Sequence, residues 1–311
     1  MRYKRFDLNL AVVLDALLAE QSVTKAGQRL NVSQTTVSDA LARLREHFGD
    51  ELLTQVGKKM VPTTLGASLQ QPVRGMLLQA DAMLNTRPAF DPRAASRSFT
   101  LMLSDYVATV LIARFVPLLQ VAAPHITLEL VPHSTVPWES LDRGEVDFLI
   151  MPASFVHDSH PSTVLFRDDF SCVVWDQNEL MGETIGMEQY LRMGHVINRV
   201  GRNRALTFDE WFFKNYGHAR RVEMIAMDFN SVPQFVVGTP RIATMHTQLA
   251  RHYARFLPIR LLKPEFELPI LEEAIQWNRF YDTDPAVTWI RELLKTTALE
   301  AVGTPQAGQK T

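Results

Sequence analysis

The chain has 311 residues, of which 46% are hydrophobic and 21% are charged, a balance typical of a globular protein with two or three domains. Its single cysteine, Cys172, excludes an internal disulfide and suits a reducing cytoplasm. The net charge of −2 divides unevenly: residues 1–97 hold 13 Lys and Arg against 9 Asp and Glu (+4), and the remainder 19 against 25 (−6). A mildly basic amino-terminal part joined to an acidic remainder indicates a nucleic-acid-binding module fused to a module with another role.

The first predicted elements are helices. Residues 8–18 are apolar on nearly every side, so we expect a helix in the middle of a small helical cluster. Residues 22–48 predict two short helices joined by a tight turn. Their apolar residues recur at helical spacing: Val23, Ala26, Leu30, Val37, Leu41, Leu44 and Phe48.

The second helix of this pair presents short polar side chains at its start. Ser33 is a natural N-cap, so the following turn points outward, with basic residues further along. A helix that enters the major groove with its amino-terminal end needs this pattern, because the short side chains read base edges and the cations hold phosphates. The expected DNA contacts here are Ser33, Gln34, Thr35, Thr36, Ser38, Arg43 and Arg45. The alternative is a surface helical hairpin within a larger domain.

Residues 51–62 alternate apolar and polar side chains around a turn at Gly57. The turn carries Lys58 and Lys59, and a basic hairpin beside a helix-turn-helix is typical of a wing that touches the DNA backbone. The alternative is an ordinary surface turn. With the helices, the hairpin predicts a winged helix-turn-helix domain over residues 1–62.

A long helix is predicted next, over residues 63–90, with a kink at Pro72. Its narrow apolar stripe indicates packing against a partner helix or, alternatively, within its own monomer. The stripe consists of Leu65, Leu69, Val73, Leu77, Ala80 and Leu84. A hinge over 91–97, with small residues and Pro92, marks the domain boundary.

From residue 98 to 302, strands alternate with helices, which predicts βαβ units and mostly parallel sheets. The strands are expected at 98–103, 126–131, 147–151, 170–175, 195–198, 222–225 and 241–244. The segment 263–277 and a helix from Pro285 return to the first sheet. We therefore expect two Rossmann-like subdomains (98–165 with 263–302, and 166–262) joined by two crossing strands, as in periplasmic binding proteins. Residues 303–311 are expected to be a disordered tail.

Ligands of open α/β sheets bind beyond the carboxyl ends of strands. This rule selects Ser104, Asp105, Pro132, His133, Met151, Asn198, Arg199, Phe229, Asn230, Met245 and Trp277. Their mixture of aromatic, methionine and polar side chains suits a flat aromatic effector. Both methionines are alternatively core residues, Asp105 a helix cap, and Arg199 an exposed cation or a partner for a carboxylate.

The chain resembles the LysR-type transcriptional regulators. The matching amino-terminal segments are 8–10, 22–26, 33–34, 37–38, 41–45, 50–53 and 61–63, and the resemblance continues in 160–166, 193–196, 220–223, 241–244 and 284–294. It is strongest to the branch of nodulation regulators that respond to flavonoids and regulators of aromatic-compound degradation. Thr35 stands where the family usually has proline, and Val56 where it often has arginine in the wing; both departures bear on the operator sequence.

The resemblance implies a fold, partners and an assembly. It implies an antiparallel dimer through the long helix, a tetramer built as a dimer of dimers, activation of transcription with contact to RNA polymerase, and a cleft in which Asp168 faces the effector. An acid at that position favours a neutral or phenolic effector over an anionic one. No cofactor or metal is expected.

Two other classes of protein fit the sequence less well. An enzyme is disfavoured because His133, His157, His160 and Cys172 lack the spacing of a catalytic or metal site, and no glycine-rich phosphate loop is present. Only the carboxyl-terminal part of the chain is compatible with a solute-binding protein of the cell envelope. No convincing signal peptide or uncharged apolar stretch of the ~18–20 residues needed to cross a bilayer is found, so a cytoplasmic protein is expected.

Overall fold

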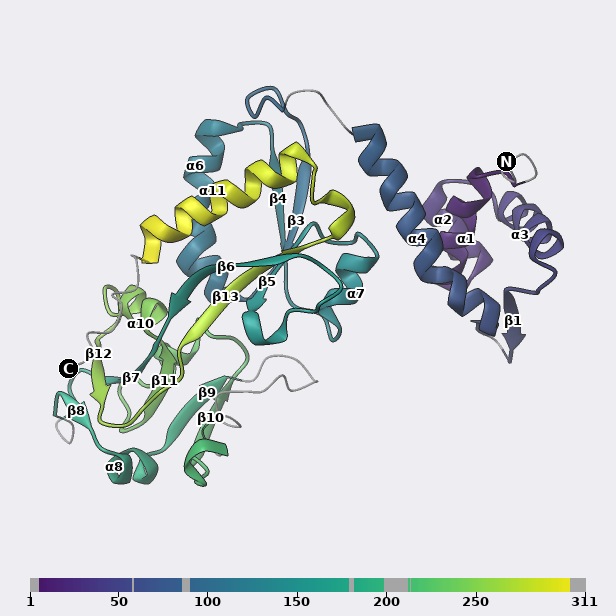
Figure 1. Cartoon of the computed structure of the whole chain (residues 1–311). Coiled ribbons are helices and arrows are strands. Elements are labelled where there is room, and N and C mark those ends of the chain that lie inside the picture. Colours follow the sequence, from purple (N-terminus) through teal and green to yellow (C-terminus); the bar gives the residue numbers. More distant parts are fainter. Residues whose placement is uncertain are drawn as a thin grey trace. The chain divides into compact units, whose positions relative to one another are not determined.

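The computed structural model describes residues 6–57, 59–85, 90–178, 182–198, 212 and 214–302. It divides into two compact units, the first built from α1 to α4 and the second from β3 to α11 (Figure 1). The predicted change from a helical amino-terminal part to an α/β remainder falls between α4 and β3. The expected tail, 303–311, lies outside the described residues.

The first unit is a helical cluster with a small hairpin. Its elements are α1 (Asn9–Glu20), α2 (Val23–Leu30), α3 (Gln34–Phe48), β1 (Leu53–Val56), β2 (Lys59–Pro62) and α4 (Thr64–Asn85). The Ser22 hydroxyl caps α2, and Asn31 ends it in the left-handed conformation. A Cβ on Gly27 would lie 3.0 Å from the Val32 carbonyl oxygen, so a residue without a side chain lets the tight turn between α2 and α3 approach this closely. Buried side chains of the three helices form one core that includes Leu14, Leu17, Ala26, Val37 and Leu44.

The stripe on α4 divides between two environments. Leu65, Leu69, Val73 and Leu77 pack into the core of the first unit, as the alternative reading of this helix anticipated. Further along, Met83 and Leu84 are 68% and 71% exposed. The helix continues through Pro72. The first half of α4 therefore belongs to the amino-terminal core, and only the second half presents an uncovered apolar surface.

Lobe I of the second unit is a five-stranded sheet with helices on it. The strand order is β4-β3-β5-β13-β6, that is Thr127–Val131, Ser98–Met102, Phe148–Pro152, Leu271–Trp277 and Ser162–Asp168. Its helical segments are α5 (Asp105–Val107), η2 (Ala108–Ile112), α6 (Ala113–Ala122), α7 (Pro137–Asp142), η3 (Ala153–Phe155), η5 (Arg279–Tyr281) and α11 (Pro285–Val302). Only β13 runs antiparallel to β5, because it is the strand that returns from lobe II.

Among the described helices, the continuous helical segment 105–122 is long and apolar enough to span a bilayer by length and composition alone. Its buried side chains, including Leu111 and Phe115, pack in the core of lobe I, and it contains the charged residues Asp105 and Arg114. This segment is therefore a core helix of the domain.

Lobe II is a six-stranded sheet of order β10-β9-β11-β7-β12-β8. These strands are Val222–Ala226, His195–Asn198, Ile242–His246, Phe170–Trp175, Ile259–Pro264 and Thr184–Ile185, with helices α8 (Met187–Arg192), η4 (Val232–Phe235) and α10 (Thr247–Tyr253). Every strand predicted over 98–244 forms, with ends within two residues of those expected. The segment 263–277 returns to the first sheet as predicted, through Leu271–Trp277 (β13), while its first two residues belong to β12; β6 and β8 were not anticipated.

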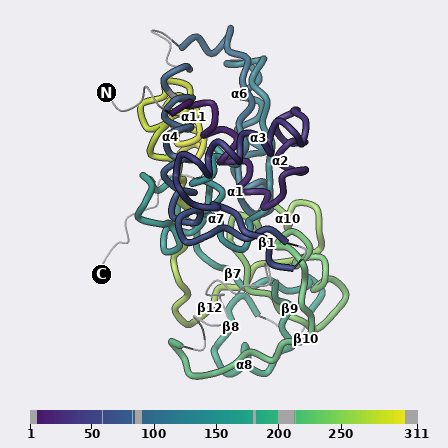
Figure 2. Tube along the Cα trace, turned by 90° about the vertical axis from the view of Figure 1, so that its right-hand side faces the viewer, coloured from purple at the N-terminus to yellow at the C-terminus, as the bar shows by residue number. Residues whose placement is uncertain are grey.

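The lobes are joined by two crossings, visible in both views (Figures 1 and 2). One lies between Asp168 at the end of β6 and Phe170 at the start of β7, and the other between Pro264 and Leu271. They were expected near residues 165 and 262, so each is displaced by a few residues toward the carboxyl end. Strand register brings Leu271 opposite Asp168 and His246 opposite Phe170. The strand ends near the crossings therefore define the junction between the lobes.

Candidate DNA-binding surface and interlobe site

The predicted recognition helix is α3, and its start has the expected cap. Ser33 is extended, and its hydroxyl accepts a hydrogen bond from the Thr36 amide at 3.1 Å and lies 2.8 Å from the Thr36 hydroxyl. Ser33 and Thr36 thus cap the helix together. Gln34, Thr35 and Ser38 are exposed beside them, while the opposite face of α3 is buried in the core.

The basic residues predicted to hold phosphates differ in their surroundings. Arg43 is exposed and donates to an Asp7 carboxylate oxygen at 3.1 Å. The Asn9 amide and this guanidinium lower the pKa of Asp7. Lys59 is exposed at the start of β2, and Lys58 lies outside the described residues.

Arg45 makes contacts within the domain that the sequence did not predict. Its Nε and Nη2 donate to the carbonyl oxygens of Glu51 and Leu53, each at 2.9 Å, and Nη2 lies 2.9 Å from the Glu51 carboxylate. These contacts direct the guanidinium to the base of the wing. Sequence reasoning treated Arg45 as a surface cation because the backbone carbonyls it holds come from a different element.

The hairpin predicted as a wing forms as an antiparallel pair of strands. Val56 lies opposite Lys59, and Gly57 turns the chain with φ of 65°. The left-handed conformation explains glycine at this position. Val56 is exposed, so this position of the wing points an apolar side chain to solvent.

At the interlobe junction, the start of α5 meets the turn after β10. The Asp105 carboxylate accepts from the Asn230 amide at 2.8 Å, and the Asn230 side chain donates to the Asp105 carbonyl oxygen at 3.2 Å. The Thr109 hydroxyl lies 3.1 Å from Asn230 Oδ1 and donates to it. Asn230 lies in the turn before the short 3-10 segment η4. Its role in the fold is to join the two lobes.

A buried polar cluster lies beside this contact. The Tyr106 hydroxyl of lobe I donates to the Asp168 carboxylate at 2.7 Å, and the same carboxylate accepts from the Gln248 amide of lobe II at 3.2 Å. The His246 ring stacks on the Tyr106 ring with centroids 4.0 Å apart. Phe229 contacts both rings, with centroids 4.9 Å from His246 and 6.2 Å from Tyr106. Aromatic rings from both lobes and an acid of lobe I therefore meet at the crossing strands.

Burial controls the charge of this cluster. Desolvation raises the pKa of Asp168 to about 6 and that of Glu273 to about 8, with the charge of Asp168 adding to the effect on Glu273. Desolvation lowers the pKa of His246 to about 3, so the ring is neutral at physiological pH. Glu273 Oε2 and His246 Nδ1 are buried and have no protein hydrogen-bond partner. Such groups are candidates for contact with a bound molecule or a water.

The other residues predicted for the effector site differ in burial and in their contacts. Ser104 caps α5 through the Val107 amide, and His133 Nε2 lies 2.9 Å from the Ile150 carbonyl oxygen, with its pKa lowered by burial. Pro132 is exposed, and Asn198 is half-buried at the end of β9. Met151 and Met245 are buried in apolar clusters, as the alternative reading anticipated. Arg199 lies outside the described residues.

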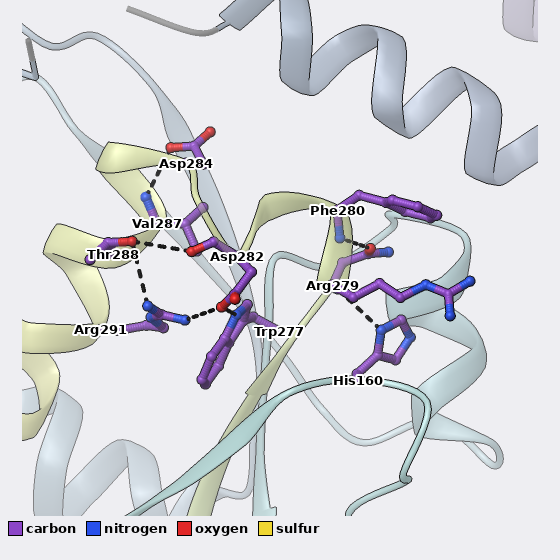
Figure 3. A network of polar contacts seen from close by, with 10 residues as sticks. His160, Trp277, Arg279, Phe280, Asp282, Asp284, Val287, Thr288 and Arg291 are labelled. Carbon is purple, nitrogen blue, oxygen red and sulfur yellow. Dashed lines mark hydrogen bonds and ion pairs between the residues drawn. The ribbon is translucent and has the colours of Figure 1, made fainter. Parts of the chain in front are cut away.

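Trp277 was placed wrongly. It pairs with Phe148 at the start of β5, so it lies at the opposite end of the sheet from the junction. Its indole N–H donates to Asp282 at 2.9 Å, and the Arg291 guanidinium lies 3.8 Å from the ring centroid (Figure 3). The carboxyl-end rule failed because β13 is antiparallel, so its amino end, with Glu273, reaches the junction instead.

Tyr106, His246 and Glu273 were not predicted. Tyr106 follows the predicted Asp105 directly, and His246 lies one residue beyond Met245 because β11 is longer than expected. An acid within the apolar run of the returning segment was the available signal for Glu273. Its significance depended on strand direction, which periodicity does not reveal.

The arrangement of a winged helix-turn-helix and a two-lobed α/β domain defines a class of DNA-binding regulators that sense small molecules. Residues 8–67 match the model of the bacterial regulatory helix-turn-helix protein, lysR family, and residues 92–299 match that of the LysR substrate binding domain. The chain therefore belongs to the LysR family of transcriptional regulators, which are not enzymes.

Among individual proteins, the chain is 42% identical to nodulation protein D 1 of Bradyrhizobium elkanii over 94% of both chains. It is similar in structure to a full-length OxyR variant from Pseudomonas aeruginosa, with a TM-score of 0.72, 16% identity and coverage of 98% of this chain and 99% of that one. It is also similar to full-length CbnR in complex with its target DNA, with a TM-score of 0.54, 14% identity and coverage of 94% and 100%. The family resemblance predicted from the sequence is confirmed.

Proposed function

We propose that this LysR-family regulator activates transcription from the cytoplasm when a small aromatic or phenolic effector binds between its two lobes. The observation that carries the proposal is the junction itself. Asp105 and Tyr106 of lobe I contact Asn230 and His246 of lobe II at the strand ends where a ligand is expected. A ligand that binds there competes with these contacts or adds to them. It therefore has different affinities for different lobe arrangements, as coupling requires.

The chemistry of the junction favours a neutral effector. Its described titratable side chains include the carboxylates of Asp105 and Asp168, the carboxyl of Glu273, which keeps its proton below about pH 8, and the neutral ring of His246. An anionic ligand would meet like charge there, whereas a phenolic hydroxyl can donate to a carboxylate, and the aromatic rings of Tyr106 and His246 offer stacking. Similarity to nodulation protein D supports the role of activator.

Specific DNA recognition is assigned to the exposed start of α3. Gln34, Thr35 and Ser38 are proposed to contact base edges, with Ser33 and Thr36 capping the helix. Arg43 and Lys59, with Lys58, are proposed to hold phosphates. The complex of CbnR with its target DNA supports this use of the domain.

A homo-oligomer, with a dimer of dimers as the functional form, is proposed from apolar surfaces that the monomer leaves uncovered. Met83 and Leu84 are exposed on the second half of α4, and the edge strands β4 and β10 carry exposed Leu130 and Ile225. Sedimentation velocity of the full chain tests this part. A monomer at micromolar concentration would refute it. Contact with RNA polymerase is the remaining proposed partnership.

The function is tested by a gel shift of the purified chain on the DNA upstream of its own gene, together with a thermal-shift screen of flavonoids, substituted phenols and salicylate-like acids. We expect sequence-specific retention at physiological salt, and stabilisation by a neutral phenolic compound but not by the acids. Equal retention on unrelated DNA would contradict the proposed function as a sequence-specific regulator. Stabilisation by acids alone contradicts the proposed effector class.

A further inference from the structure

The corner between α3, the wing and α4 contains a set of contacts that neither core packing nor DNA contact explains. Asp50 follows Gly49, which ends α3 with φ of 62°. Its Oδ1 accepts two short hydrogen bonds, each 2.6 Å long, from the Leu52 amide and from the Thr63 hydroxyl. Leu52 enters the wing and Thr63 leaves it. One carboxylate oxygen therefore ties together the two ends of the hairpin.

Thr63 continues the connection into α4. Its amide donates to the Leu52 carbonyl oxygen at 3.0 Å, and its hydroxyl accepts from the Gly66 amide at 3.0 Å, as an N-cap does. A Cβ on Gly66 would overlap the Leu52 carbonyl oxygen, so the first turn of α4 lies directly against the base of the wing. Leu52 is fully buried with φ of 59°, an unusual conformation for a branched side chain that the surrounding contacts hold in place.

Arg45 attaches the recognition helix to the same corner. From the last turns of α3 it holds the carbonyl oxygens of Glu51 and Leu53, the residues on either side of Leu52. Further along α4, Arg74 donates to Asp15 of α1 at 2.8 Å. The recognition helix, the wing and the first half of α4 are therefore linked to one another by polar contacts as well as by the core.

We propose that Arg45, Asp50 and Thr63 form a clamp that fixes the direction of α4 relative to α3 and thereby determines which spacing between two DNA half-sites the dimer accepts. The inference rests on the proposed pairing of chains through α4. The three are positioning residues, because they act through the geometry of the recognition helix. Two DNA-binding domains held at a fixed separation match DNA half-sites of one spacing. If the junction between α3 and α4 were flexible, the two domains would accept several spacings.

The experiment compares the full-length protein with Thr63→Val, which removes the hydroxyl but keeps the branched shape. Thr63→Ser restores the hydroxyl, and Ser68→Ala removes another α4 hydroxyl, which donates to the Leu65 carbonyl oxygen away from the clamp. Binding is measured by fluorescence anisotropy on three duplexes derived from the footprint on the DNA upstream of the gene: both half-sites at native spacing, the same half-sites moved apart by half a helical turn, and one half-site alone.

We expect the parent chain, Thr63→Ser and Ser68→Ala to prefer native spacing strongly. Thr63→Val should lose about tenfold or more of this preference while its affinity for the single half-site changes by about twofold or less. Its melting temperature, measured alongside, separates loss of geometry from loss of folded protein.

Two results overturn the clamp: a Thr63→Val protein with the spacing preference of the parent, or an equal loss on all three duplexes. If the parent chain itself binds both spacings equally, the result contradicts the proposed pairing of chains through α4. It then contradicts the clamp as well, because the clamp depends on that pairing. Sedimentation of the parent then reports whether a dimer forms at all. If the parent binds no DNA specifically, the proposed function fails, a result distinct from each of the others.

Discussion

Glu273 gives the sharpest prediction about the lobe junction. It is 3% exposed, and burial raises the pKa of its carboxyl from 4.5 to about 8. A raised carboxyl pKa means that the folded chain binds the proton more tightly than the unfolded chain. The buried, protonated Glu273 carboxyl therefore leaves the stability of the folded chain intact below pH 4.5, and stability is lost as the pH rises through 8.

The size of the effect follows from the shift. Each pH unit between the two pKa values corresponds to about 1.4 kcal/mol, so ionisation of Glu273 costs the folded state about 4–5 kcal/mol by pH 8. Glu273→Gln replaces the carboxyl by a neutral group of nearly the same shape. Relative to the parent, the variant should be similar in stability at pH 5 and more stable by about 4 kcal/mol at pH 8.

Tryptophan fluorescence during urea unfolding measures this difference, because all five tryptophans, Trp138, Trp175, Trp211, Trp277 and Trp289, follow the amino-terminal unit in the chain. Asp282→Asn is a matched control, since that carboxylate is exposed and its pKa is lowered by the Trp277 indole N–H and Arg291. Parent and Glu273→Gln curves that stay parallel between pH 5 and pH 8 would show that the carboxyl titrates normally, and the physical reading of the junction would be wrong.

Three predictions concern binding. Gln34→Ala should weaken specific DNA binding by about 1–3 kcal/mol in anisotropy titrations and leave the salt-dependent component in place; an equal loss on every sequence would contradict a base contact. Lys59→Ala should weaken all sequences alike and reduce the salt slope by about one, and an unchanged slope would remove Lys59 from the phosphate contacts. Asn230→Leu removes the side-chain bonds to Asp105 and Thr109, so the effector should no longer alter promoter activity while operator binding persists in the gel shift; normal induction would exclude Asn230 from the coupling.

Local pattern was sufficient for much of the fold. The caps at Ser22 and Ser33 act within four residues of the helices they start, and apolar periodicity reports a buried face directly. Exposed Gln34 and Thr35 could be predicted for the same reason, since a residue opposite a buried stripe faces solvent. The functional assignment of these residues came from the resemblance to a family and stays a proposal for each one.

Strand direction limited the prediction of the junction. The sequence indicated strands ending at 151 and 244 and a segment returning at 277, but periodicity carries no information about which strand is antiparallel. As a result Trp277 was assigned to the junction although it lies at the other end of the sheet, beside Phe148, and Glu273 was overlooked. Likewise, only the tertiary position of the wing shows that Arg45 holds the carbonyl oxygens of Glu51 and Leu53.

The sequence alone determined the order and type of the main elements, the exposed start of the recognition helix and the membership of a regulator family, because each depends on residues close together in the chain. Only the tertiary structure decided which groups share a site. Tyr106, Asp168, His246 and Glu273 come from four separate segments, and their neutral or charged state arises from mutual burial. The stripe on α4 shows the same division: its period is local, but whether Leu69 or Leu84 is covered depends on helix α1 and its neighbours in the folded chain.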